Sequence, residues 1–243
     1  MKYTFAELHL HTAEVSGCAS VSGADAPLIF KEQGYDLICV TDHYKYTTFW
    51  YYNDNKDPSW EHRANHFLSG YRLAKAAAEK IGLTVLLGAE ICFDNCPNDY
   101  LVYGLNEEMI YKYPELYRWS VEEFSSFARK NQLFFAQAHP FRNQRMIRTS
   151  PSLLDGAEAY NTHDTEHKTP AEDMKRAKLW VKENNLVPLL GQDFHDAENI
   201  LGAKTAFYGE VRDSETLTKK LHAKEFDFIL SNQTITKEDF LTI

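Results

Sequence analysis

Two pairs of potential metal ligands stand one residue apart in the chain. His9 and His11 end the run FAELHLH, and Asp193 and His195 follow VPLLGQ (187–192). Side chains at positions i and i+2 of an extended segment point to the same side, so each pair can offer two ligands to one cation. Imidazole combined with carboxylate suits Zn, Mn, Fe or Ni better than Ca. The spacing therefore predicts a transition-metal site.

Further residues of the same types follow other apolar runs. They are Asp42 and His43 after DLICVT (36–41), Glu90 after TVLLGA (84–89) and His139 after LFFAQA (133–138). Taken alone, a histidine here can be an ordinary hydrogen-bonded residue, Glu90 can cap a helix and Asp42 can start a turn. Their joint occurrence favours a metal site, because unpaired buried charges are costly. Pro140 also favours an extended backbone at His139.

The apolar runs predict an α/β fold with a parallel sheet. Short, β-rich runs cover residues 5–10, 36–41, 84–89, 100–105, 133–138, 156–160 and 187–192. Helical patterns cover residues 24–33, 61–81, 120–130, 171–185 and 213–223. This alternation predicts βα units, in either a closed barrel or an open doubly wound sheet. Both architectures gather functional groups at the carboxyl ends of the strands.

Composition narrows the class of protein. A chain of 243 residues fits one large domain, and a net charge of −9 without a Lys/Arg run makes nucleic acid an improbable partner. The four cysteines show no C-x-x-C spacing, and the start MKYTFAELHL does not resemble a signal peptide. No apolar run approaches the roughly 20 residues that span a bilayer. We therefore expect a soluble, cytoplasmic protein that does not enter the membrane.

The motifs resemble those of the PHP superfamily, the polymerase and histidinol phosphatase domain. They are HLHT at 9–12, TDH at 41–43, GAE at 88–90, AHPFR at 138–142 and DFH at 193–195, in the order found in the family. The resemblance implies a distorted (β/α)7 TIM-like barrel, and a single catalytic domain over residues 1–243. It also implies two or three divalent metal ions, usually Zn, Mn or Fe.

The resemblance further implies a set of ligands. One metal would be held by His9, His11, Glu90 and Asp193, a second by Glu90 and His139, and a third by His43 and His195. Asp42 would be an outer group that orients a ligand imidazole.

This chain departs from the family pattern at two positions. Where many members carry a histidine shortly after the first motif, the chain offers Glu14 or Cys18. Where many carry one at the start of the fourth strand, it has Asp99. A carboxylate favours a harder metal such as Mn or Fe, whereas Cys18 would favour Zn. The occupancy of the third position is therefore left open.

Other histidines and one aromatic segment have structural as well as functional interpretations. The helical stretches contain His62, His66 and His222, while His163 and His167 follow the sixth apolar run and are weaker candidates for ligands. Segment 44–60 contains many aromatic residues and follows His43 directly. Such a loop can be a lid over a substrate or plain hydrophobic packing.

Clustered divalent cations point to hydrolysis of a phosphate ester. They can lower the pKa of a bound water to about 7 and neutralise phosphoryl oxygens, so that a metal-bound hydroxide attacks phosphorus. The guanidinium of Arg142 could hold phosphate oxygens, or form a surface salt bridge. We expect a small phosphorylated substrate, as a monoester or a diester. The alternatives are a nuclease and a regulatory metal-binding domain without turnover.

Overall fold

The computed structural model describes residues 2–50, 59–162, 171–200, 202–231 and 233–242. The strands are β1 (Tyr3–Leu10), β2 (Leu37–Val40), β3 (His43–Tyr44), β4 (Thr84–Cys92), β5 (Asp99–Tyr103), β6 (Phe134–Gln137), β7 (Gly156–Asn161), β8 (Val187–Gly191), β9 (Lys204–Tyr208), β10 (Phe226–Leu230) and β11 (Gln233–Ile235). The α-helices are α1 (Ala26–Glu32), α2 (Tyr46–Trp50), α3 (Trp60–Phe67), α4 (Ser69–Ala78), α5 (Glu107–Lys112), α6 (Val121–Lys130), α8 (Ala171–Glu183), α9 (Ser214–His222) and α10 (Lys237–Phe240). Within the described residues, no helix has both the length and the apolar character needed to cross a membrane.

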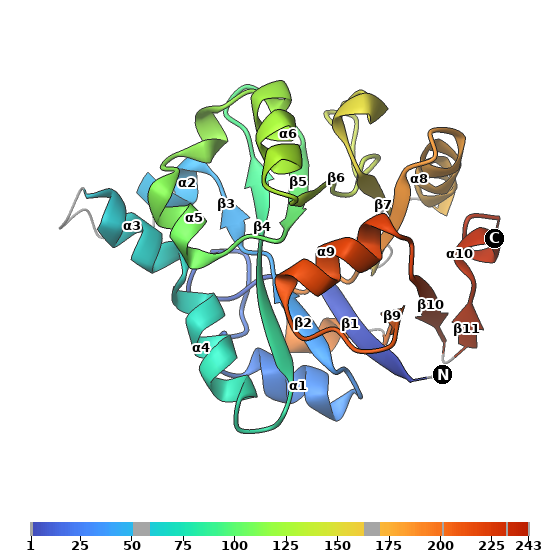
Figure 1. The fold of residues 1–243 in the computed structure, drawn as a ribbon, viewed down its shortest axis with the longest axis horizontal. Helices are drawn as coiled ribbons and strands as arrows, with labels where there is room; N and C mark the ends of the chain where they lie inside the picture. The colour runs from blue at the N-terminus through green and yellow to red at the C-terminus, as the bar shows by residue number, and fades with distance from the viewer. Residues whose placement is uncertain (1, 51–58, 163–170, 201, 232, 243) are drawn as a thin grey trace.

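The strands form one curled sheet with helices around it (Figure 1). Its order is β11-β10-β9-β1-β2-β4-β5-β6-β7-β8, and β3 pairs with β4. The sheet curls until the residues after β8 reach the end of β1, where a parallel bridge joins Leu10 to Phe194. The Phe194 amide donates to the His9 carbonyl, and the His11 amide donates to the Phe194 carbonyl, both at 3.0 Å. This contact brings the first and last motifs of the sequence together.

The seven apolar runs predicted as strands correspond to β1, β2 and β4 to β8. The expectation that all of them run parallel is wrong for 100–105, because β5 is antiparallel to both β4 and β6. The connection 93–98 is too short to contain a crossover helix, so it can join only antiparallel neighbours. As a result, β5 starts at the edge of the sheet where its antiparallel neighbours β4 and β6 end. Asp99, its first residue, lies at that edge.

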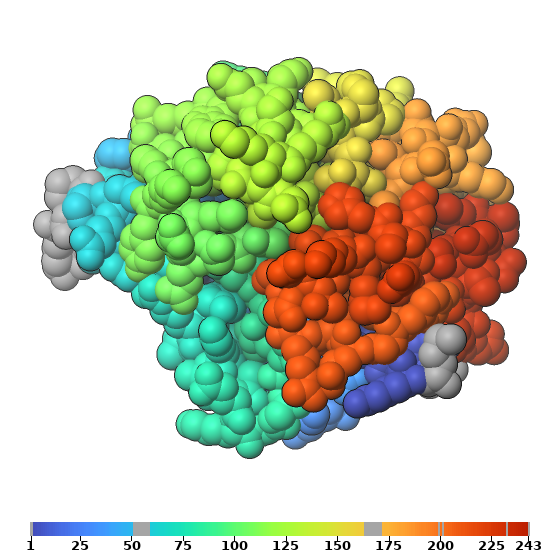
Figure 2. Space-filling model, in the orientation of Figure 1, coloured from blue at the N-terminus to red at the C-terminus, as the bar shows by residue number. Residues whose placement is uncertain are grey.

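The C-terminal strands β9, β10 and β11 extend the sheet beyond the predicted runs. They are antiparallel, and β9 pairs with β1. In Figure 2 the C-terminal segment, in orange and red, lies beside the start of the chain, in blue. The sequences of β9, β10 and β11 mix polar and apolar residues, as is usual for antiparallel strands that are buried on one face only. A search for continuous apolar runs therefore does not find them.

The helix predicted over 61–81 is divided into α3 and α4 at Leu68. The Ser69 hydroxyl donates to the His66 carbonyl at 2.7 Å, a bond of the kind that bends helices. Just after this break, Gly70 lies against the segment that follows β1. A Cβ at Gly70 would collide with Thr12 Oγ1 and come within 3.0 Å of Asp42 Oδ2. The absence of a side chain at Gly70 therefore lets α4 pack beside the ends of β1 and β2.

The described part of segment 44–60 packs as core. Tyr44 and Phe49 are buried, with ring centroids 4.7 Å apart, and the ring of Phe67 lies 5.1 Å from that of Tyr44. The Arg63 guanidinium lies 3.4 Å over the ring of Trp50. Residues 44–50 thus anchor α2 against α3. Residues 51–58 lie outside the described part of the chain, so a lid there stays a prediction.

Replacing Gly70 with Ala should destabilise the protein by about 1–3 kcal/mol, the usual cost of forcing an extra methyl group into a packed site. The cost arises because the methyl group must displace Thr12 and its contact with Asp42. Urea denaturation would measure the loss as a lower midpoint with an unchanged slope. Leu73→Ala, at an exposed position of the same helix, is the control and should change the midpoint little. A Gly70→Ala protein as stable as wild type would contradict the packing described here.

Candidate metal centre

Five of the predicted ligands converge in one buried cluster. His9, His11, Glu90, His139 and Asp193 are each at most 2% exposed. The Nε2 atoms of His9 and His11 lie 3.2 and 3.1 Å from Asp193 Oδ1. His139 Nε2 lies 2.9 Å from Glu90 Oε1, and His9 Nε2 lies 3.4 Å from the same oxygen. Ring nitrogens and carboxylate oxygens from four distant segments thus face one another.

The strands and their ends hold these side chains in place. His9 belongs to β1 and Glu90 to β4, whereas His139 and Asp193 follow β6 and β8. In the ladder between β3 and β4, His43 lies directly opposite Glu90. The ligand-type residues therefore collect at one edge of the sheet, as the sequence pattern predicted.

The backbone at His139 differs from the expectation. An extended conformation before Pro140 was predicted, but His139 has a φ of 25°. The His139 amide donates to Glu158 Oε2 at 2.8 Å, which holds the chain in a sharp turn directly after β6. Such an unfavourable backbone angle persists only where the surroundings stabilise it, as this hydrogen bond does.

Asp193 and His195 also do not repeat the extended geometry predicted for them. Asp193 has a φ of 52°, in the left-handed region, and His195 Nδ1 lies 2.6 Å from the Asp193 carbonyl oxygen. The turn follows from the bridge between β1 and the residues after β8, which fixes Phe194 against His9. Asp193 still faces the cluster, but His195 lies at its border.

The charged side chains of the cluster strongly shift one another's pKa. Burial alone lowers the pKa of His9, but the carboxylates of Asp193, Glu158 and Glu90 outweigh it and raise that pKa well above its usual range. Burial likewise raises the pKa of Glu90 and of Asp193, yet neighbouring imidazoles hold both well below the usual range. The two carboxylates therefore stay ionised and attract positive charge to this position.

The donor set fits divalent cations. His9 Nε2 and His11 Nε2 lie 3.2 Å apart, and His139 Nδ1 is buried without a hydrogen-bond partner among the described residues. Groups of ligand atoms close enough to share an ion are His9/His11/Glu90, His9/His139/Asp193, Glu90/Asp99/His139 and His11/His43/His195. Nitrogen and oxygen donors in these combinations are those that Zn, Mn and Fe accept.

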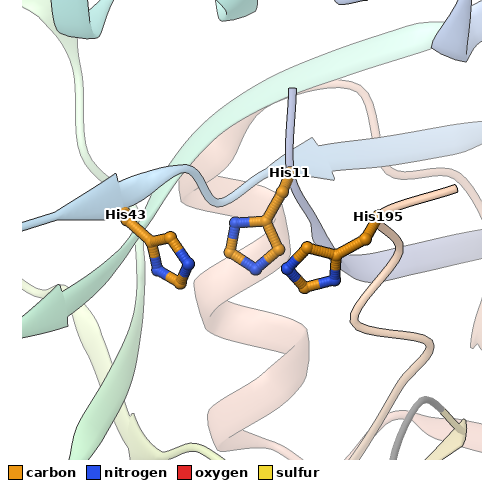
Figure 3. Close-up of side chains that lie close together, drawn as sticks. All are labelled: His11, His43 and His195. Atoms are coloured by element: carbon orange, nitrogen blue, oxygen red, sulfur yellow. The ribbon is translucent and has the colours of Figure 1, made fainter. Parts of the chain in front are cut away.

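His43 and His195 border the cluster on either side of His11 (Figure 3). Their ring centroids lie 4.4 and 4.5 Å from that of His11. Of the two alternatives for a further ligand, Cys18 is near, with Sγ 3.3 Å from His43 Nε2. Glu14 points elsewhere and accepts a hydrogen bond from the Gly23 amide at 2.8 Å. Burial raises the pKa of Cys18, but hydrogen bonds with His195 and His43 outweigh it and lower the pKa to about 6.

Asp99 lies beside the cluster, whereas Asp42 lies one residue further out. Asp99 Oδ2 lies 4.0 Å from His139 Nε2, close enough to share an ion with His139 and Glu90. Asp42 instead accepts hydrogen bonds from the Thr12 amide and hydroxyl and from the Ser16 hydroxyl, at 2.6–2.7 Å. Ser16 Oγ lies 3.3 Å from His11 Nδ1. Asp42 thus reaches the cluster through Ser16 and the His11 ring.

Arg142 forms an ion pair with Asp193, and its side chain is 27% exposed. The guanidinium therefore lies at the rim of the cluster, with one end on a predicted ligand. This contact is stronger than the surface salt bridge considered from sequence, because Asp193 is 1% exposed.

Sequence reasoning missed two buried carboxylates beside the cluster. Glu158 Oε1 lies 2.8 Å from His9 Nδ1, and Gly191 leaves room for this contact because a Cβ there would collide with both side chains. Glu7 accepts the His9 amide at 2.7 Å, and burial raises its pKa to about 7. The available signal was an acidic residue inside each of the apolar runs FAELHL and GAEAY. A buried charge of this kind needs a partner.

Three further histidines lie on helices of the described part of the chain. As predicted, the helices contain His62 and His66, in α3, and His222, in α9. His163 and His167 lie outside the described residues.

Comparison with known proteins shows which solved structures share this fold. Neither a protein-family model nor a curated protein matches the chain. Among solved structures, the chain matches a two-domain protein from Bacteroides vulgatus that contains a predicted PHP-like metal-dependent phosphoesterase. The match has a TM-score of 0.70 and 17% identity, and it covers 99% of this chain and 68% of that one. The chain has the fold of the PHP-like phosphoesterases. The resemblance inferred from five short motifs is therefore confirmed at the level of fold.

Two further solved structures share this fold. PsfC from Pseudomonas syringae matches with a TM-score of 0.63 and 13% identity, over 100% of this chain and 96% of that one. The lesion-specific endonuclease PfuEndoQ from Pyrococcus furiosus matches with a TM-score of 0.58 and 12% identity, over 91% of this chain and 56% of that one. The PHP-like fold thus accommodates very different sequences.

Glu158→Gln should weaken binding of Mn²⁺ or Zn²⁺ by about 10–100-fold, the usual effect of losing the outer partner of a ligand histidine. The change keeps the shape of the side chain but removes the charge that holds His9 Nδ1. Isothermal titration of the chelator-treated protein would measure the affinity. Glu183→Gln, on the exposed end of α8, is the matched control and should bind like wild type. Unchanged affinity in Glu158→Gln would show that Glu158 does not support the cluster.

Proposed function

We propose that the protein hydrolyses phosphate esters with divalent cations held by the buried cluster. The observation that carries this proposal is the convergence of His9, His11, Glu90, His139 and Asp193 within hydrogen-bond distances of one another. Such a group of buried imidazoles and carboxylates is costly unless cations balance it. The PHP-like fold supports the same assignment, since a neighbour of that fold is described as containing a predicted PHP-like metal-dependent phosphoesterase.

We assign the ligands to three positions. The first would be formed by His9, His11, Glu90 and Asp193, the second by Glu90, His139 and Asp99, and the third by His43 and His195. Cations bound there would activate water and neutralise the oxygens of a phosphoryl group. Around them, Glu158 would hold His9 in the correct orientation through Nδ1, and Asp42 would orient His11 through Ser16.

We further propose that Arg142 positions the substrate. Its guanidinium lies at the rim of the cluster and already holds one carboxylate oxygen of Asp193. A planar guanidinium at this rim has the geometry that suits phosphate oxygens. Such a contact would favour substrates with a small, accessible phosphate group.

A small phosphorylated molecule is the substrate class that we favour. The net charge of −9 would repel a nucleic-acid backbone, which proteins usually bind through basic surfaces. The similarity of the fold to that of an endonuclease keeps cleavage of nucleic-acid diesters as the second candidate. We also propose that residues 1–243 form a single catalytic domain and that the curled sheet is a distorted (β/α)7 barrel, because β8 returns to β1. Location in the cytoplasm stays a prediction.

Purified protein supplied with Mn²⁺, Zn²⁺ or Fe²⁺ should release phosphate from a generic aryl phosphate. His9→Ala should lower this rate by more than about 100-fold, because it removes a central ligand and not merely an outer partner. Phosphate release would be followed by a colorimetric assay, and bound metal by elemental analysis. His222→Ala, outside the cluster, is the control and should keep the wild-type rate. Equal turnover by chelator-treated and metal-loaded wild type would disprove the proposal.

Arg142→Lys should raise the KM for the aryl phosphate about tenfold, which corresponds to about 1.4 kcal/mol. Lysine keeps the positive charge beside Asp193 but lacks the planar fork for phosphate oxygens. Steady-state kinetics and metal titration of the same preparation separate the two roles. If KM is unchanged and metal binding is weaker, Arg142 acts by holding Asp193 and not by holding phosphate. A screen of phosphorylated metabolites against diesters and single-stranded DNA would then distinguish the two candidate substrate classes.

A further inference from the structure

The third position needs a ligand beyond its histidines. His11 Nε2 lies 3.1 Å from Asp193 Oδ1 and 3.5 Å from Glu90 Oε2, so it faces the first position. Its other ring nitrogen, Nδ1, lies 3.3 Å from Ser16 Oγ. A ring nitrogen has one lone pair and can coordinate one cation. If His11 serves the first cation, His43 and His195 are left as the histidine ligands of the third among the residues that the structure describes.

In the rings of His43 and His195, Nδ1 faces an oxygen atom. His43 Nδ1 lies 2.6 Å from Glu90 Oε2, and His195 Nδ1 lies 2.6 Å from the backbone carbonyl of Asp193. Histidines that bind metals commonly use one ring nitrogen for such an oxygen and the other for the ion. In each ring the other nitrogen, Nε2, would then be the atom that coordinates a cation.

The thiol of Cys18 lies where a third ligand would be required. Its Sγ atom lies 3.3 Å from His43 Nε2 and also forms a hydrogen bond with the His195 side chain. Zinc bonds of about 2.3 Å to sulfur and about 2.1 Å to nitrogen, at a tetrahedral angle, place two such ligand atoms about 3.6 Å apart. The observed separation is close to this value. Glu14, the other candidate, is bound to the Gly23 amide.

We propose that Cys18 is a thiolate ligand that, with His43 and His195, makes the third position a zinc site. This inference rests on the metal centre of the proposed function and extends it to metal selectivity. Thiolate is a soft donor that selects zinc, whereas the second position, with Glu90 and Asp99, offers the oxygen donors that Mn and Fe accept. The centre would therefore hold two kinds of metal.

Binding of zinc at this position would exchange the thiol proton for the cation. The thiol gives its proton to solvent and its sulfur lone pair to the cation, with no change in oxidation state. Two imidazoles and one thiolate leave the fourth tetrahedral position open, as in zinc sites that bind water or substrate. Cys18 is exposed, so this open position can be reached from solvent.

Cobalt substitution tests the thiolate directly and does not require turnover. Chelator-treated protein would be titrated with Co²⁺ alone, and wild type should show an intense near-ultraviolet charge-transfer band from sulfur to cobalt. Cys18→Ser should lose this band. Cys96→Ser is the matched control and should keep it, since Cys96 Sγ lies beside Tyr100 OH at 3.3 Å. Zinc content, measured by elemental analysis, should fall by about one ion per chain in Cys18→Ser.

Cys18→His tests ligation against a purely structural role. An imidazole can replace the thiolate, so the zinc content should recover while the cobalt band stays absent. No band in wild type, or an equal band in Cys18→Ser, would disprove the proposal. These outcomes are distinct from failure of the proposed function, because a thiolate band can be present in a protein that releases no phosphate. Circular dichroism of each variant would confirm that it is folded.

Discussion

The balance of charge around Glu90 is the constraint on which the centre depends. This carboxylate is 1% exposed and lies within 3.5 Å of nitrogen atoms from His9, His11, His43 and His139. A buried carboxylate without positive partners would be strongly destabilising. The neighbouring imidazoles offset part of this cost, and their nitrogen lone pairs lie in the same place. The cluster is therefore organised to hold cations, whether protons or metal ions.

Backbone geometry gives this cluster its shape. The return of the residues after β8 to the end of β1 places Asp193 beside His9 and His11. Positive φ angles at His139 and Asp193 then aim these side chains inward from the ends of their strands. Such conformations persist only where surrounding contacts stabilise them, such as the bond from the His139 amide to Glu158. The fold and the centre thus stabilise each other.

The proposed metal positions differ in the ligand atoms that they offer. The second combines the oxygen atoms of Glu90 and Asp99 with one imidazole. The third lies at the border, next to the exposed thiol of Cys18. Hard oxygen ligands and a soft sulfur ligand prefer different cations, so the two proposed positions would select different metals. Arg142 lies at the rim, where a phosphate group would enter.

The sequence by itself determined which residue types gather in the cluster and the strands that carry or precede them. His9, Glu90 and Asp193 could be found because apolar, β-rich runs precede polar residues, and parallel strands bring their carboxyl ends to one edge. Local patterns of this kind depend only on neighbours in the chain. For the same reason, the resemblance to the PHP superfamily could be read from five short motifs.

Only the tertiary structure decided the direction of β5, the choice between Glu14 and Cys18 as the nearer side chain, and the roles of Glu158 and Glu7. Each depends on contacts between residues far apart in sequence, such as Glu158 with His9 or Cys18 with His43. Hydrophobic periodicity describes which face of a segment is buried, and it does not specify which segment lies opposite. Pairing across the curled sheet supplies that information, so the outer partners of the centre became visible only once the chain was folded.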